Sequence, residues 1–243
     1  MILANVRHRL SRDDAQLVLR LISRGSDSEL QKAEERLRDE GIDALLDDPG
    51  LVSALIEARQ GAHASFQLFA YVMVRNALRR VGEDDRGLAD YVASILLNFG
   101  LRSRATRIGD ADDEQYDTIA GLCEDLDDPD AQRSFLVRAH LGNYALWLSG
   151  LFPDHVEQRR WRRGAPDIEY YDEMGSRGFR LAADHRLAAQ HGLTTLFSVA
   201  AERFVRLRLA LNAISDSLLF PNVSSPERLM RQVRDESRWR LTA

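Results

Sequence analysis

The sequence predicts an all-α protein, a multi-helix array with a C-terminal bundle built around one long helix at about residues 193–220. Three observations indicate this class. No run of residues alternates apolar and polar side chains as a strand does, and no Asn-Gly or Asp-Gly hairpin turn joins two apolar runs. Residues that begin and end helices recur along the chain. The C-terminal half also carries a long apolar seam at helical spacing.

The helices expected in the N-terminal half have clear start and stop signals. Ser11 is a good N-cap for the residues after it, which carry acids in the first turn, and Gly25 ends that helix. Asp27 or Ser28 begins a second helix, which ends at Gly41. Three further helices are expected over residues 51–60, 64–81 and 87–99.

A polar stretch over residues 101–130 separates the two halves, because it contains Gly109, many acids and Pro129, with one helix near residues 116–124. We therefore divide the sequence into an acidic helical region (1–109), an acidic connecting segment (110–130) and a helical bundle (131–243). The two halves can still pack as one domain.

The net charge also differs along the chain. Residues 1–130 carry 16 basic and 26 acidic side chains, a net charge of −10, whereas residues 131–243 carry 17 and 12, a net charge of +5. This division indicates either complementary faces of packed helices or a basic face that meets an acidic partner.

The helices expected in the C-terminal half begin with residues 131–151. A shorter helix follows, with Pro153 in its first turn, and extends to Arg163. Ser224 or Ser225, followed by Pro226 and Glu227, indicates the start of a last helix to about Trp239. Between them we expect helices over residues 167–173, 175–191 and 193–220.

The seam of the longest helix is its clearest feature. Its apolar residues alternate steps of four and three, so they lie along one side of a gently supercoiled helix about 39 Å long. They are Leu193, Phe197, Ala200, Phe204, Leu207, Leu211, Ile214 and Leu218. We expect this seam to be buried in the bundle or in a dimer interface.

Composition indicates a cytoplasmic bacterial protein. Cys123 is the single cysteine, so no internal disulfide forms, and the N-terminal residues do not resemble a secretory signal. Residues 135–152 are the most apolar stretch, but they are too short and too polar to span a membrane. Arginine supplies every positive side chain except Lys32, a bias typical of GC-rich bacterial genes.

The usual catalytic motifs are missing, so we predict no catalytic residue, no metal site and no cofactor. The sequence has no Glu-x-x-His pair, no Gly-x-Ser-x-Gly elbow and no glycine-rich phosphate loop. The acidic run Asp110, Asp112, Asp113, Glu114 and Asp117 fails as a calcium loop, because Gln115 and Gly121 stand where glycine and glutamate are required. Cys123 lies among acids, which raise the pKa of a thiol.

Polar residues on apolar helices form one candidate ligand site. His140, Asn143 and Tyr144 share one helix face, and Arg208, Asn212 and Asp216 share another with Ser215. If the two faces pack together, they form either an internal hydrogen-bond network or a polar pocket, which Tyr170 would line or cap.

Arginine-rich helices form a second candidate. Arg159, Arg160, Trp161 and Arg163 lie in the densest basic cluster, with an aromatic residue inside it as in single-strand nucleic-acid surfaces. The last helix adds a stripe of arginines: Arg228, Arg231, Arg234 and Arg238.

The favoured function is a cytoplasmic binding or adaptor protein that acts through contacts with a protein partner or with further copies of itself. Two alternatives remain: a helical enzyme or small-ligand sensor with a polar pocket, and a protein that binds nucleic acid or phosphate through the arginine-rich helices.

Overall fold

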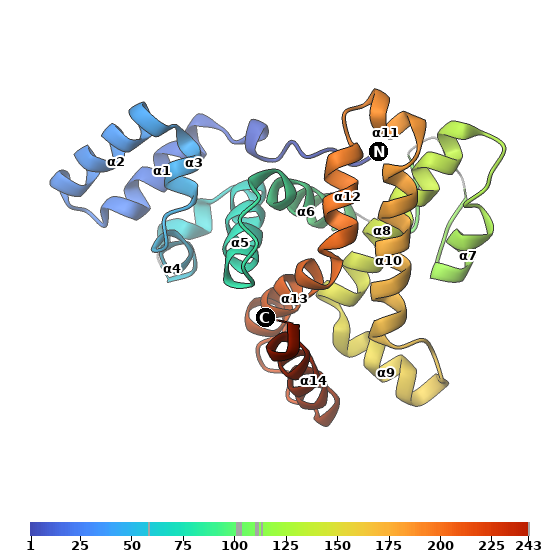
Figure 1. Ribbon diagram of the computed structural model, residues 1–243. Coiled ribbons are helices and arrows are strands. Elements are labelled where there is room, and N and C mark those ends of the chain that lie inside the picture. The colour runs from blue at the N-terminus through green and yellow to red at the C-terminus, as the bar shows by residue number, and fades with distance from the viewer. Residues whose placement is uncertain (58, 101–103, 110–111, 113, 243) are drawn as a thin grey trace. The chain divides into compact units, whose positions relative to one another are not determined.

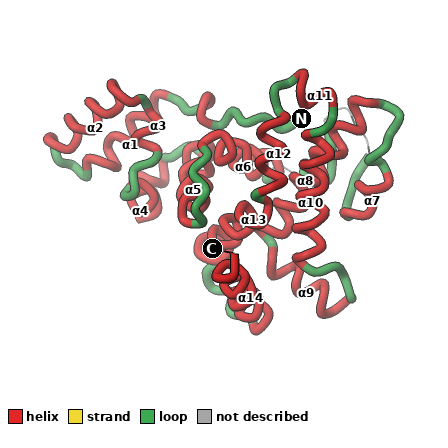
Figure 2. The backbone as a smooth tube through the Cα atoms, viewed as in Figure 1, coloured by secondary structure: helices red, strands yellow, loops and turns green. Residues whose placement is uncertain are grey.

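The computed structural model describes residues 1–57, 59–100, 104–109, 112 and 114–242, without the side chains of residues 59, 60 and 237–242. These residues form fourteen α-helices and no β-strand (Figures 1 and 2), so the all-α prediction is confirmed. None of the helices in the described ranges is both long enough and apolar enough to cross a bilayer. The chain divides into two compact units, residues 2–98 and residues 99–243, with Met1 grouped with the second.

The N-terminal unit is an array of short helices, coloured blue to green in Figure 1. Its first long helix begins as predicted, because Ser11 and Asp14 form a reciprocal capping box, and the chain leaves it through Arg24 and Gly25 at positive φ. The elements are η1 (Arg7–Arg9), α1 (Arg12–Ser23), α2 (Asp27–Glu40), α3 (Ile42–Leu46), α4 (Leu51–Glu57), η2 (Arg59–His63), α5 (Phe66–Arg80) and α6 (Arg86–Phe99).

Asp47, at the end of α3, ties this unit together. Its carboxylate accepts hydrogen bonds from Arg75 on α5 at 2.7 Å and from Arg86 on α6 at 2.8 Å. These two guanidinium groups lower the pKa of Asp47 against the opposing effect of burial. Leu68, Tyr71 and Leu88 are fully buried in the core of this unit.

The C-terminal unit is arranged around α8. Residues on every side of this helix are buried, because α7, α9, α10, α11 and α13 all pack against it. Such a helix is apolar all round rather than on one stripe. The elements are α7 (Ile119–Glu124), α8 (Ala131–Leu151), α9 (Pro153–Arg163), α10 (Ile168–Ala183), α11 (Arg186–Gln190), α12 (Thr194–Glu202), α13 (Phe204–Ile214), the π-helical turn η3 (Ser215–Leu219) and α14 (Pro226–Thr242).

The expected long helix at 193–220 is two helices and a π-helical turn. The chain leaves helical geometry at Arg203, between α12 and α13. The break follows from packing, because α12 lies against α10 whereas α13 lies against α8. The seam itself is buried from Leu193 to Ile214, and only Leu218 is partly exposed.

Gly175 does not end a helix, contrary to the expected break between residues 173 and 175. Helix α10 runs through it without interruption. A Cβ at this position would lie 2.2 Å from the ring of Phe204 and 2.9 Å from Ala145, so the glycine allows a close approach of three helices.

Candidate functional site

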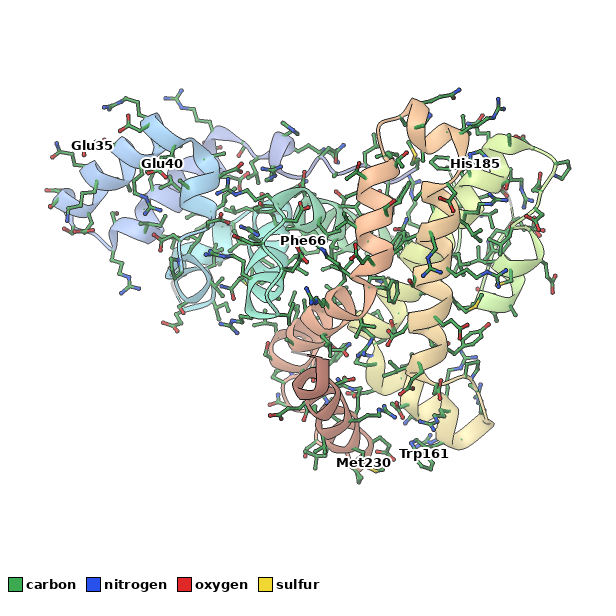
Figure 3. All side chains as sticks on the ribbon, in the orientation of Figure 1. Glu35, Glu40, Phe66, Trp161, His185 and Met230 are labelled. Carbon is green, nitrogen blue, oxygen red and sulfur yellow. The ribbon has the colours of Figure 1, made fainter. Side chains whose placement is uncertain are left out.

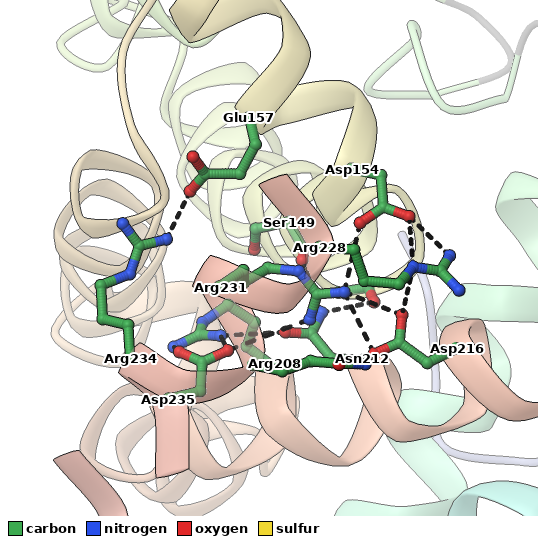
Figure 4. Close-up of polar contacts among 12 residues, drawn as sticks. Ser149, Asp154, Glu157, Arg208, Asn212, Asp216, Arg228, Arg231, Arg234 and Asp235 are labelled. Carbon is green, nitrogen blue, oxygen red and sulfur yellow. Dashed lines mark hydrogen bonds and ion pairs between the residues drawn. The ribbon is translucent and has the colours of Figure 1, made fainter. Parts of the chain in front are cut away.

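A buried ionic cluster surrounds Arg208 on α13 (Figure 4). The Arg208 guanidinium donates to Asp172 of α10 at 2.8 Å, to Asn212 at 3.0 Å and to Asp235 of α14 at 3.2 Å. Burial disfavours the charge on Arg208, but Asp172 and Asp235 outweigh burial and raise its pKa. Burial also raises the pKa of Asp172. The cluster joins three helices through buried charges.

Asn212 and Ser215 extend this cluster to the end of α8. The Asn212 amide donates to the carbonyls of Ser149 and Gly150 at 2.8 and 2.7 Å, and the Ser215 hydroxyl donates to the Leu151 carbonyl at 2.8 Å. The last carbonyls of a helix lack partners within the helix, so these side chains act as its cap.

His140, Asn143 and Tyr144 are also buried, but they lie further back on α8. The His140 Nε2 donates to the carbonyl of Ala105 at 2.9 Å, and the Tyr144 hydroxyl donates to the carbonyl of Asp117 at 3.1 Å. Burial lowers the pKa of His140 to about 4, so the imidazole is neutral.

The two polar faces therefore contact different parts of the C-terminal unit. His140 precedes Ser149 by nine residues, about 13 Å along a helix axis. The two faces were expected, if packed together, to form one hydrogen-bond network or one polar pocket. Instead, His140 and Tyr144 bond to Ala105 and Asp117, and Arg208 bonds to α10 and α14. The side chain of Tyr170 belongs to neither of these hydrogen-bonded groups. Its ring packs edge-on against Tyr171, with ring centroids 5.9 Å apart.

The arginines of α14 do not form an exposed stripe, contrary to the expected nucleic-acid surface. Arg231 is 1% exposed and donates to Asp216 at 2.8 Å and to Asp154 at 3.2 Å. Arg228 is also buried and binds Asp154, while Arg234 binds Glu157 of α9 (Figure 4). The predicted residue Arg238 lies outside the described side chains. The stripe faces inward because carboxylates from α9 and η3 lie beneath it.

The opposite face of α14 is apolar and exposed. Leu229, Met230 and Val233 are 58, 62 and 66% exposed, and Figure 3 shows Met230 at the surface. At 100° per residue, their mean direction lies roughly opposite that of Arg228, Arg231 and Asp235. This face was not predicted from the sequence. The spacing of the three apolar residues could have indicated it, because this spacing puts them on the side of the helix away from the arginines.

The basic cluster on α9 is partly dispersed around the helix. Arg160 lies 3.7 Å from Glu157 and over the ring of Trp161, which is 60% exposed (Figure 3). Arg159 and Arg163 instead line a hollow of about 410 Å³ together with Asp117, which we call the basic hollow.

A second hollow lies on the neighbouring side of α9. This apolar groove has a volume of about 520 Å³ and borders the first turn of α14 at Glu227. Its large apolar lining residues are Phe152, Pro153, Trp161, Phe220 and Val223. His155, Gln158 and Arg162 line both hollows and form the ridge between them.

The acidic segment before α7 binds arginine. Asp112 and Glu114 both pair with Arg133 of α8, whereas the candidates Asp110 and Asp113 lie outside the described residues. Cys123 on α7 is partly buried, and burial raises the pKa of its thiol. Within the described ranges, no three histidine, cysteine or acidic side chains gather as metal ligands do.

Comparison of the chain with known protein families, with curated proteins and with solved structures gives no match in any of the three.

Proposed function

We propose that this protein is an adaptor that binds a partner protein through the outward face of α14, the surface formed by Leu229, Met230 and Val233. The observation that carries the proposal is the reversed polarity of this helix, which buries Arg228 and Arg231 and exposes Leu229, Met230 and Val233. Leaving three large apolar residues in water brings no stability to an isolated chain. Contiguous exposed apolar surface is typical of protein interaction sites.

The apolar groove beside α14 supports the same function. Its volume of about 520 Å³ is sufficient for a large apolar side chain, and Trp161 and Phe220 at its wall remain exposed. Binding energy in protein interfaces concentrates where one such side chain fills a pocket. We infer that the partner inserts an apolar anchor residue here and lays further apolar residues along α14.

The partner is expected to be acidic. Residues 131–243 carry a net charge of +5, so an acidic segment would approach this unit faster and bind it better at low salt. We place the interaction in the bacterial cytoplasm, because the chain has a single cysteine and uses arginine almost to the exclusion of lysine.

Site-specific photocrosslinking tests the proposal. A benzophenone amino acid at position 233 should crosslink one partner in cells of the native host, whereas the same amino acid at Phe66, which is 62% exposed on α5, should not. The purified partner should then bind the wild-type chain, bind Val233→Glu at least about tenfold more weakly, a loss of about 1.4 kcal/mol, and bind Phe66→Glu normally.

Equal crosslinking at both positions, or equal affinity of the partner for wild type and Val233→Glu, would exclude this surface. Crosslinks only to another copy of the chain would replace the adaptor function with self-association. Binding that does not weaken as salt rises would contradict the acidic character of the partner.

A further inference from the structure

The basic hollow has an unusual charge balance within the C-terminal unit. Arg159, Arg162 and Arg163 of α9 line it, and among the described residues Asp117 is the one acid beside them. The three arginines and the one aspartate give the described lining a net charge of +2. The hollow therefore attracts anions.

These three arginines also differ from the others of the unit in their partners. Arg208, Arg228, Arg231 and Arg234 each bind carboxylates, whereas Arg159, Arg162 and Arg163 pair with no acidic residue in the described part of the chain. Moreover, the Nε of Arg159 is buried, and no described residue accepts a hydrogen bond from it. A buried guanidinium N–H without an acceptor costs free energy, and no carboxylate in the described part of the chain offsets the burial of this arginine.

The spacing of the arginines suits a compact dianion. Positions 159, 162 and 163 are separated by three and four residues, so they share one face of α9, and position 155 lies one turn before them. Guanidinium groups bind phosphate oxygens through paired N–H donors, and a net charge of +2 balances the two charges of a phosphate monoester.

A nucleic-acid strand fits this surface less well. A strand needs a basic track that follows its backbone, but on α14 Arg228 and Arg231 are buried and Arg234 is paired with Glu157. Asp117 would also repel a chain of phosphates. A single terminal phosphate can occupy the arginine side of the hollow and avoid that carboxylate.

We propose that the basic hollow binds the terminal phosphate of a small phosphate monoester, whose apolar body crosses the ridge at His155 and Arg162 into the apolar groove. This site goes beyond the adaptor function and does not depend on the outward face of α14, but it shares the apolar groove, so the ligand and the partner's anchor residue would exclude each other there. Free phosphate and a monoester share the anionic group, and the apolar groove distinguishes them because only a monoester can fill both hollows.

Titration calorimetry of the full chain tests this site with phenyl phosphate, inorganic phosphate and diphenyl phosphate. Phenyl phosphate should bind most tightly, since it combines two charges with an apolar ring, and diphenyl phosphate should bind most weakly, since it carries one charge. Arg159→Gln and Arg162→Gln should each weaken phenyl phosphate binding at least about tenfold. Arg186→Gln, an exposed arginine on α11, is the matched control and should leave it unchanged.

Other outcomes are equally clear. Equal binding of phenyl phosphate and inorganic phosphate would indicate a site for free phosphate and would contradict the proposed monoester ligand. Tighter binding of oligothymidylate, lost in the same variants, would replace the proposal with a nucleic-acid surface. Binding that survives both arginine substitutions would exclude the hollow. Arg162 is exposed, so its variant keeps the test valid even if Arg159→Gln fails to fold. Val233→Glu should bind phenyl phosphate normally, which separates this site from the adaptor surface.

Discussion

Gly178 of α10 lies against Gly142 of α8 so closely that a Cβ added at residue 178 would be 2.7 Å from the backbone nitrogen of residue 142. The obstacle is main chain, which cannot move aside as a side chain can. The contact lets α8 and α10 approach each other closely, and the packing of the unit around α8 depends on it.

We expect Gly178→Ala to destabilise the C-terminal unit by about 1–3 kcal/mol, because the two helices must separate to admit the methyl group. Urea unfolding followed by circular dichroism measures the loss. Gly109→Ala is the matched control, since its Cβ would meet only a Leu136 methyl group at 3.9 Å. An unchanged free energy of unfolding for Gly178→Ala would contradict the prediction and show that the two helices can separate without cost.

The reversed polarity of α14 predicts an unusual pattern of mutational effects. Leu229→Ser and Val233→Ser should change the free energy of unfolding by less than about 0.5 kcal/mol, because both side chains are exposed. Arg231→Ser should lower it by about 1–3 kcal/mol, because Asp154 and Asp216 lose one of their two buried arginine partners and keep Arg228. The opposite ranking in urea denaturation would mean that α14 packs through its apolar face.

Removal of Arg208 should be among the most damaging single changes in the chain. Arg208→Ala leaves Asp172 and Asp235 buried with no opposite charge from α13, which we expect to cost about 3–5 kcal/mol. Adding Asp172→Asn to this variant should restore part of the loss, since it removes one of the uncompensated charges. Additive effects in this double-mutant cycle would contradict direct coupling between the two residues.

Buried His140 predicts a dependence of stability on pH. Its folded-state pKa of about 4 lies below the unfolded value of about 6.5, so its contribution is complete above pH 6.5 and is lost as the pH falls toward 4. The expected loss is about 3 kcal/mol. His140→Gln keeps an N–H donor for the Ala105 carbonyl but does not titrate. Its unfolding free energy should fall less steeply over this range, and an unchanged slope would place the pH dependence elsewhere.

Many helix boundaries could be predicted because they depend on neighbouring residues. Ser11 caps α1 through the backbone N–H of Asp14, and α9 runs from Pro153 to Arg163 as expected. Helix α8 also begins and ends where predicted. Capping and proline geometry are local effects, so a single sequence contains them.

The errors arose where distant contacts decide the outcome. Gly175 resembles a helix end in sequence, but the rings and methyl groups of other helices require its small size inside α10. The helix breaks at Arg203 because α12 and α13 pack against different helices, which the spacing of apolar residues does not reveal.

The candidate site was harder to predict for the same reason. Sequence alone placed Arg231 on a solvent-exposed stripe, because arginine is rarely buried. Asp154 lies 77 residues earlier and reverses that expectation by binding Arg231 in the interior. The charge of α14 was evident, but its orientation depended on acids from α9 and η3.

The position of Cys123 has a practical consequence. It is the one thiol of the chain, and it lies on α7, the helix that follows Thr118 at the wall of the basic hollow. A maleimide dye would attach at that residue alone, preferably in mildly alkaline buffer because burial raises the pKa of the thiol. Its emission would then follow occupancy of the hollow in solution. The native sequence thus contains its own attachment point for a fluorescent reporter.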